Sequence, residues 1–257
     1  MRSIFLDRPR APAPFWAKAA TFALLLIILS LICTGVLLGS TRQWTVVWGY
    51  RHAFIQGWFL TVLISVLALF GSSLIGVIAA LARRSEILVI RYISTIYVNF
   101  VRGTPFLVLI FLLFYCIPAV TEGADRLFVG AMALSLFAGA YIAEIVRSGI
   151  ESVGQSQRDS ARAIGLTRFQ TYRYVIFPQA IRHILPPLAG QFASLIKDSS
   201  LLSVMGLPEV TYAAQQINSA TYSTLESFLP LALAYLVLTL PIALASNVLE
   251  GRFRYET

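Results

Sequence analysis

A polar interruption at residues 102–105 divides a long apolar stretch and offers groups that could bind a charged solute. The four residues are Arg102, Gly103, Thr104 and Pro105. Proline removes a backbone hydrogen-bond donor and glycine lowers the cost of distortion, so we expect a membrane helix to break here. Arg102 and the loosened backbone near Thr104 would then bind a carboxylate. The alternative is a kink at the membrane interface, with Arg102 extending to lipid phosphates.

Four further ionisable residues lie within or at the ends of apolar stretches, where a charge is costly and therefore informative. Glu144 stands three residues before Arg147, so the two side chains can pair on a helix. Lys197 and Asp198 are adjacent, and because adjacent helix residues do not face each other, we expect different partners for them. We favour structural ion pairs for both sets, with contact to a bound solute as the alternative.

The composition predicts the elements that must position these residues. The chain has 257 residues, of which 58% are hydrophobic and 12% charged, whereas soluble domains carry about 25% charged residues. Six apolar windows are long enough to cross ~30 Å of hydrocarbon as helices. They are apolar on every face, unlike barrel strands, so we expect an all-α polytopic membrane protein. The windows are 19–39, 53–82, 92–119, 127–148, 184–206 and 227–248.

Lysine and arginine are unequally distributed between the loops that flank these windows. Fifteen lie in one set of loops and three in the opposite set, with Arg102 and Lys197 left out because they fall near or inside apolar windows. Short cytoplasmic loops are enriched in these residues, so both termini are predicted to face the cytoplasm. The net charge of +8 does not indicate nucleic acid binding, since the arginines are spread over four membrane-flanking loops. The first window is longer than a signal-peptide core and predicts an uncleaved anchor.

Cysteine and histidine usage indicates neither a metal centre nor a catalytic site. Cys33 and Cys116 fall in separate expected spans and lack the spacing of a metal site or a disulfide. His52 and His183 stand at segment ends, where a solvated imidazole is the simpler interpretation and a proton relay the alternative. We therefore expect no metal ligand and no catalytic residue in this chain.

The polar segment 148–182 is far longer than the usual connection between bundle helices, which is about 2–8 residues. Ser156 and Asp159 fit a capping box and predict the start of a helix. Gly165 suits the end of that helix, because glycine adopts the left-handed conformation without strain, and Leu166 can supply the accompanying apolar contact. The first helix is therefore predicted to be about two turns long.

A second helix is predicted directly after this glycine bend. Thr167 and Gln170 repeat the capping box, and Phe169, Tyr172 and Ile176 follow at helical spacing. Pro178 is expected to stop this helix. A helix of two turns is marginal in water, so the first helix needs a surface to pack against, which is either the membrane interface or a partner protein.

The spacing of this segment resembles that of a known family. Permease subunits of ATP-binding cassette importers carry Glu-Ala-Ala, three residues, Gly, nine residues and Ile-x-Leu-Pro before the penultimate span. This chain has Asp159-Ser160-Ala161, three residues, Gly165, nine residues and Val175-Ile176-Phe177-Pro178. The stretches Val101 to Tyr115 and Ala161 to Gly206 resemble the polar amino acid branch, which carries histidine, glutamate, glutamine, arginine and opines.

The resemblance implies a domain organisation and a separate ATPase subunit. Residues 1–52 would form a tail, an additional anchor and an external loop. Residues 53–250 would form a five-helix type I permease core containing the coupling loop 148–182, and residues 251–257 a cytoplasmic tail. The first short helix would be a coupling helix that docks on a separate ATPase. The coupling residues carried over from the motif are Asp159, Ser160, Ala161, Gly165 and Pro178.

The same resemblance implies partners and a substrate path. ATP and Mg would be bound by the partner ATPase, because the only lysines follow Ala17 and Ile196 and the chain lacks the glycine-lysine pair of a phosphate-binding loop. The implied partners are an ATPase dimer, a second permease that is identical or paralogous, an extracytoplasmic amino-acid-binding protein and the lipid bilayer of a bacterial inner membrane.

An amino acid would cross as a zwitterion. Arg102 and the backbone near Thr104 would bind its carboxylate, and Glu144 its ammonium group if the third and fourth spans face one cavity. Lys197 and Asp198 are further candidates for the path. A secondary transporter is the main alternative function, although it would not need a capped docking helix. An intramembrane hydrolase is the other alternative, and the absence of a G-x-S-x-G motif gives it little support.

The charge asymmetry generates a topology prediction. Single cysteines at Ser40 and Thr121 should react with a membrane-impermeant thiol reagent applied to intact cells, whereas a cysteine at Gln157 should react only after permeabilisation. Labelling of the Gln157 position from outside would show that the predicted orientation is inverted.

Overall fold

The structure is a computed structural model that describes residues 24, 27, 30, 44–116 and 125–253. The chain divides into two units, Met1–Gln43 and Trp44–Thr257. Apart from Leu24, Ile27 and Ser30, the expected first span lies outside the described residues. The described residues form helices and no strand, which confirms the predicted all-α class.

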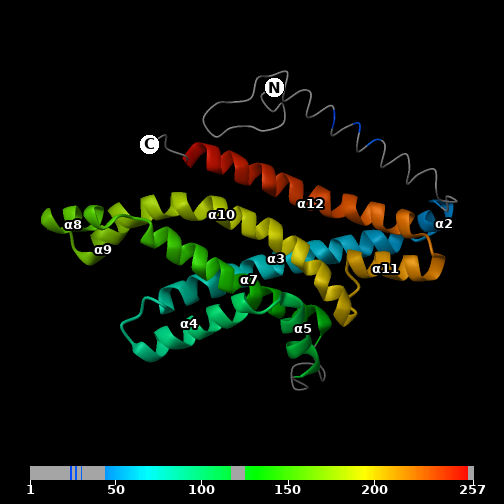
Figure 1. Ribbon diagram of the computed structural model, residues 1–257, viewed down its shortest axis with the longest axis horizontal. Coiled ribbons are helices and arrows are strands. Elements are labelled where there is room, and N and C mark those ends of the chain that lie inside the picture. The colour runs from blue at the N-terminus through cyan, green and yellow to red at the C-terminus, as the bar shows by residue number, and fades with distance from the viewer. Residues whose placement is uncertain (1–23, 25–26, 28–29, 31–43, 117–124, 254–257) are drawn as a thin grey trace, which may run out of the picture. The chain divides into compact units, whose positions relative to one another are not determined.

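The second unit contains twelve described helical elements (Figure 1). They are α2 (Trp44–Gly49), α3 (Arg51–Ala82), α4 (Leu88–Gly103), α5 (Phe106–Tyr115), α7 (Arg126–Glu151), α8 (Gln155–Ala163), α9 (Arg168–Thr171), the π-helix η1 (Tyr172–Ile176), α10 (Phe177–Asp198), the 3-10 helix η2 (Ser199–Met205), α11 (Val210–Thr221) and α12 (Thr224–Phe253).

Three of the described helices are long and apolar enough to cross a membrane, namely α3, α7 and the part of α12 up to Ser246. A fourth span results if the bent pair α4 and α5 is counted as one. The expected spans at 53–82, 127–148 and 227–248 are therefore found as long apolar helices. α10, which contains most of the expected span 184–206, is not among them.

The expected span 92–119 is not one straight helix. α4 and α5 meet at an angle of 111°, and the break falls at the sequence that predicted it. Thr104 is extended, with φ −113° and ψ 132°, as expected for a residue that precedes proline. Pro105 then serves as the N-cap of α5. Because proline has no N–H to donate to the preceding turn, the chain starts a new helix in a new direction.

Pro178 does not stop the second helix of the loop, so that expectation is wrong. α9, η1 and α10 follow one another without a gap from Arg168 to Asp198. The N–H of Phe177 bonds to the carbonyl of Tyr172 five residues back, which is the wider spacing of a π-turn. This change of register brings Pro178 into the first turn of α10, where a missing N–H is tolerated.

α7 packs along α3 through small residues that let the two backbones come close. A Cβ added at Gly76 would lie 2.6 Å from Cγ2 of Ile142, and one added at Gly139 would lie 2.9 Å from Cγ2 of Ile75. Each helix thus receives a branched side chain of the other into a glycine notch. The main core continues from this interface to fully buried leucines of α10 and η2.

Hydrogen bonds to the side chain of Glu209 join α3, α11 and α12. In the ribbon, α11 lies toward the end of the unit opposite α8 (Figure 1). The buried Glu209 carboxylate caps α11 by accepting from the backbone of Thr211 and Tyr212, at 2.9 and 2.8 Å. It also accepts from Thr61 of α3 and from Tyr235 of α12. Burial raises the pKa of the Glu209 carboxyl, and because its neighbours supply four donors, this buried group is satisfied.

Candidate functional site

The predicted interruption is a corner between two helices. Gly103 ends α4, and the hydroxyl of Thr104 donates to the carbonyl of Phe100 at 2.8 Å, so this side chain satisfies its own helix. No side chain caps the first turn of α5. The amide groups of Val108 and Leu109 donate to the carbonyl of Pro105, at 3.0 and 3.2 Å. Those of Phe106 and Leu107, the first two residues of α5, precede the helical hydrogen-bond ladder and are left available to an acceptor from outside.

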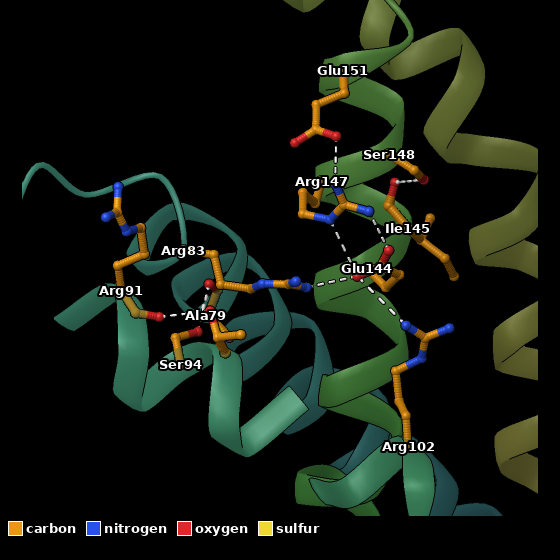
Figure 2. Close-up of polar contacts among 11 residues, drawn as sticks. Ala79, Arg83, Arg91, Ser94, Arg102, Glu144, Ile145, Arg147, Ser148 and Glu151 are labelled. Atoms are coloured by element: carbon orange, nitrogen blue, oxygen red, sulfur yellow. Dashed lines mark hydrogen bonds and ion pairs between the residues drawn. The ribbon is translucent and has the colours of Figure 1, made fainter. Parts of the chain in front are cut away.

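Glu144 of α7 is shared by three arginines, which point toward it from three elements (Figure 2). Arg83, the C-cap of α3, donates to Oε2 at 2.6 Å. Arg102, from the last turn of α4, has its Nη1 3.5 Å from the same oxygen. Arg147 of α7 donates to both carboxylate oxygens and also pairs with Glu151. The Glu144 cluster, defined by Glu144, Arg83, Arg102, Arg147 and Glu151, therefore joins α3, α4 and α7.

The predicted pair of Glu144 with Arg147 is confirmed, and the cluster adds two partners. We expected Arg102 and Glu144 to act together only if the third and fourth spans faced one cavity. The structure brings the two side chains to within 3.5 Å of each other. Arg83 was missed as a partner. Its place among the basic residues just after an apolar window was the available signal, but the same signal applied equally to Arg84.

Arg102 is the outermost and most weakly held arginine of the cluster. Its side chain is 40% exposed, against 16% for Arg83 and 27% for Arg147. Its guanidinium also lies over the ring of Tyr141, 5.6 Å from the centroid, an attraction of the cation–π type. Since the cluster holds three cations and two anions, it carries a net charge of +1. Arg102 is therefore the member best able to exchange Glu144 for another carboxylate.

Lys197 and Asp198 end α10 and do not belong to the Glu144 cluster. Lys197 is exposed and Asp198 is half-buried. Among the described residues, neither side chain makes a hydrogen bond or an ion pair, so the structural ion pairs that we favoured for them are not found. Their adjacency on a helix explains why they do not pair with each other.

The predicted helix–glycine–helix segment exists, with one change at its start. α8 begins at Gln155 with Gly154 as its N-cap, so Ser156 is not the cap and that prediction is wrong. Gly154 already has a φ of −56° and a ψ of 148°, which suits an N-cap and lets the helix begin earlier. The carboxylate of Asp159 instead accepts a hydrogen bond from the side-chain amide of Gln155, at 2.9 Å.

The glycine bend after α8 has the expected conformation. Gly165 has a φ of +81°. Its N–H bonds to the carbonyl of Arg162 at 2.9 Å, and the N–H of Leu166 bonds to that of Ala161 at 3.1 Å. These two bonds define a Schellman ending of a helix. The capping box of Thr167 with Gln170 is also present, which confirms the second helix start.

The surface of this segment contains large exposed apolar side chains. Ile164 is 76% exposed and Phe169 is 75% exposed, one on each side of Gly165. Of the other motif residues, Ala161 is buried, while Asp159, Ser160 and Pro178 are exposed. Val153, Ile176 and Ala180 anchor the base of the segment in a small core. Exposed apolar groups held on a rigid support are typical of a surface that contacts another protein or a membrane.

Known proteins of one family are similar to this chain over the region that contains these motifs. The sequence profile of the binding-protein-dependent transport system inner membrane component matches residues 72–255. The chain is 37% identical over 199 residues to the probable glutamine ABC transporter permease protein GlnM of Bacillus subtilis, covering 77% of this chain and 92% of that one. It is 33% identical over 214 residues to the glutamine transport system permease protein GlnP of Escherichia coli K12, covering 82% and 98%.

A solved structure is similar over the same region. The crystal structure of an amino acid ABC transporter with histidines matches with a TM-score of 0.77 and 34% sequence identity. The match covers 83% of this chain and all of the other. Because identity and fold agree over most of the length, the similarity is not limited to the short motif of the loop.

The Glu144 cluster generates a stability prediction with a built-in control. Glu144→Gln leaves three arginines without their shared carboxylate and should lower the free energy of unfolding by about 1–3 kcal/mol, less than at a fully buried pair because the cluster is partly exposed. Glu151→Gln removes the same charge where the side chain is 49% exposed and should cost about 0–1 kcal/mol. Denaturant titration of the full chain in detergent measures both. Equal losses in the two variants would contradict a central role for Glu144.

Proposed function

The chain belongs to the family of binding-protein-dependent transport system inner membrane components, and from that membership we propose how its own residues serve amino acid import. It is a permease subunit of an ATP-binding cassette importer for amino acids. We propose that it works with a dimer of a cytoplasmic ATPase, a second permease and an extracytoplasmic binding protein. ATP and Mg would be bound by the ATPase, and this chain would supply the path.

The surface formed by α8, Gly165 and α9 carries this proposal. Ile164 and Phe169 project from a segment whose base is fixed in a small core. The Schellman ending at Gly165 sets the angle between the two helices, so both apolar side chains are presented together. A groove on the ATPase would bury them. The exposed Asp159 and Ser160, on the same helix, would make its polar contacts.

A movement of this docking surface would be transmitted through helices at both of its ends. α8 begins four residues after the end of α7, and α9 continues through η1 into α10 without a break. Displacing the segment would therefore move α7 and α10. α7 carries Glu144, so the motion would reach the cluster that joins it to α3 and α4. Changes in the contacts with the ATPase would thus switch the helix bundle between an inward-open and an outward-open state.

We assign the substrate path to the corner between α4 and α5. A zwitterion carries one carboxylate and one ammonium group, and Arg102 with Glu144 offers one partner for each. In the described state these two groups face each other at 3.5 Å. The substrate would replace this pair with two pairs of its own, and the first amide groups of α5 beside Thr104 would add donors for the carboxylate. Lys197 and Asp198 stay as further candidates for this path.

The location follows from the same membership. The protein is a multi-pass membrane protein of the bacterial inner membrane. We propose that both termini and the α8–α9 segment face the cytoplasm, where the ATPase would be. The basic residues of the loops support this orientation, because they gather on the side that holds α8.

Gly165→Val tests the docking surface. Valine strongly disfavours a φ of +81°, and because nothing lies within 4 Å of an added Cβ, the effect is one of backbone conformation. We expect uptake of labelled polar amino acids, and its coupling to ATP hydrolysis, to fall at least about tenfold at unchanged membrane levels. Gly154→Val is the matched control, because a φ of −56° and a ψ of 148° suit valine, and it should retain uptake. Normal uptake by Gly165→Val would show that the docking assignment is wrong.

Arg102→Lys tests the substrate path. Lysine keeps the charge but loses the planar fork that binds a carboxylate through two hydrogen bonds, whereas a residue that only anchors to lipid phosphate would tolerate it. We expect impaired uptake with near-normal basal ATP hydrolysis by the assembled importer. Arg91→Lys, an exposed arginine of the first turn of α4, is the control and should behave like the parent. If Arg102→Lys and Glu144→Gln both support parental uptake, these residues belong to the scaffold.

A further inference from the structure

A cavity of about 250 Å³ lies beside the docking surface and is lined by four arginines. Arg158 and Arg162 come from α8, Arg168 from α9, and Arg84 from the turn that follows α3. Tyr172 of η1 completes the polar wall. We call this the arginine pocket. Its volume is several times the ~30 Å³ that one water molecule occupies in the liquid, so it can hold a group of several heavy atoms.

The positive charge of the arginine pocket is poorly compensated by the described residues. Among residues 44–116 and 125–253, Glu86 is the one carboxylate within ion-pair distance of these arginines, 3.6 Å from Arg168, and both side chains are at least 90% exposed. Such a pair contributes little. Arg84 donates to the neutral hydroxyl of Tyr172 at 2.8 Å. In the Glu144 cluster, by contrast, a carboxylate reaches every guanidinium.

Arg158 points most directly to a missing acceptor. Its Nη2 donates to the carbonyl of Ile150 at 2.8 Å, which fixes the guanidinium. Its Nε is buried and has no hydrogen-bond partner within the described part of the chain. Buried polar groups are almost always paired, and an unpaired charged donor is especially costly. Arg158 therefore carries a poorly compensated charge in the wall of the arginine pocket, and an anion bound there would stabilise it electrostatically.

We propose that the arginine pocket binds a phosphate group, supplied by the headgroup of an anionic phospholipid or by a free phosphate ion. A phosphate offers several oxygens to several guanidiniums at once, and the planar fork of arginine matches two of them. The bilayer is near, because Arg84 stands two residues after α3, a helix able to span the membrane. Basic pockets at the cytoplasmic ends of membrane helices are suited to lipid headgroups.

The bound group would have a structural consequence for the docking surface. It would tie Arg84, at the end of α3, to Arg158 and Arg162 on α8 and to Arg168 on α9. These are the two helices that Gly165 separates. A phosphate in the pocket would therefore hold α8 and α9 together and against the C-terminal end of α3. This role is distinct from docking on an ATPase.

Native mass spectrometry of the purified, delipidated full chain tests this proposal. The probes are dihexanoyl phosphatidylglycerol, inorganic phosphate and dihexanoyl phosphatidylcholine. The phosphatidylcholine headgroup is zwitterionic, and its cationic choline next to the phosphate should weaken binding to a pocket of arginines. The parent should bind one phosphatidylglycerol, and the double variant Arg158→Gln, Arg162→Gln should bind it at least about tenfold more weakly. Arg173→Gln is the matched control, because Arg173 lies in the same segment, is exposed and does not line the pocket. It should bind like the parent.

The outcomes separate the sources and the rival ligand. If the parent binds phosphatidylglycerol but not inorganic phosphate, the natural ligand is the lipid headgroup. If it binds both equally, the natural ligand is the phosphate ion. If the double variant fails to fold, Arg158→Lys decides, since it keeps the charge but should weaken binding by losing the fork. Equal loss in Arg173→Gln, or parental binding by the folded double variant, overturns the proposal. The proposal is also overturned if the parent binds none of the probes. In that case, loss of ATPase binding by the double variant would identify a carboxylate of the ATPase as the ligand.

Discussion

The packing of α3, α4 and α7 against one another depends on the carboxylate of Glu144. Three guanidiniums from the ends of α3 and α4 and from α7 meet there (Figure 2). Glu144, together with Glu151 next to Arg147, offsets most of the charge that would otherwise make these three cations repel one another. Because the pairs are only partly buried, they can be exchanged at moderate cost.

The helices α7 and α10 connect this cluster to the exposed surface of α8 and α9. Both helices join the α8–α9 segment with little or no flexible chain between them. The π-turn at η1 matters here, because it lets Pro178 stand within a continuous helical run and so avoids a hinge at the point where force would be transmitted. In the proposed function, these short connections would pass a displacement of the segment on to α7 and α10. The corner at Pro105 has the opposite effect, since it divides a span between α4 and α5.

Two neighbouring arginines at the end of α3 illustrate how position decides the role of a charge. Arg83 points to the Glu144 cluster and ends in a short, charge-assisted hydrogen bond. Arg84 points to the arginine pocket and meets only a neutral hydroxyl. Their sequence environment is almost the same, and a residue count treats them alike as markers of a cytoplasmic loop. The difference between a satisfied and an unsatisfied cation appears only when the partners from α7 and α8 are in place.

The sequence by itself determined the features that depend on a few neighbouring residues. The left-handed Gly165, the capping box at Thr167 and the break at Pro105 follow from local backbone chemistry, and the all-helical class follows from apolar runs of membrane length. Tertiary structure decided what depends on space. It brought Arg83 to Glu144 across 61 positions, left Lys197 and Asp198 out of the cluster, and allowed the chain to continue past Pro178. A sequence pattern fixes which groups a helix offers, but distances between helices, which set every ion pair and cavity, arise only from their packing.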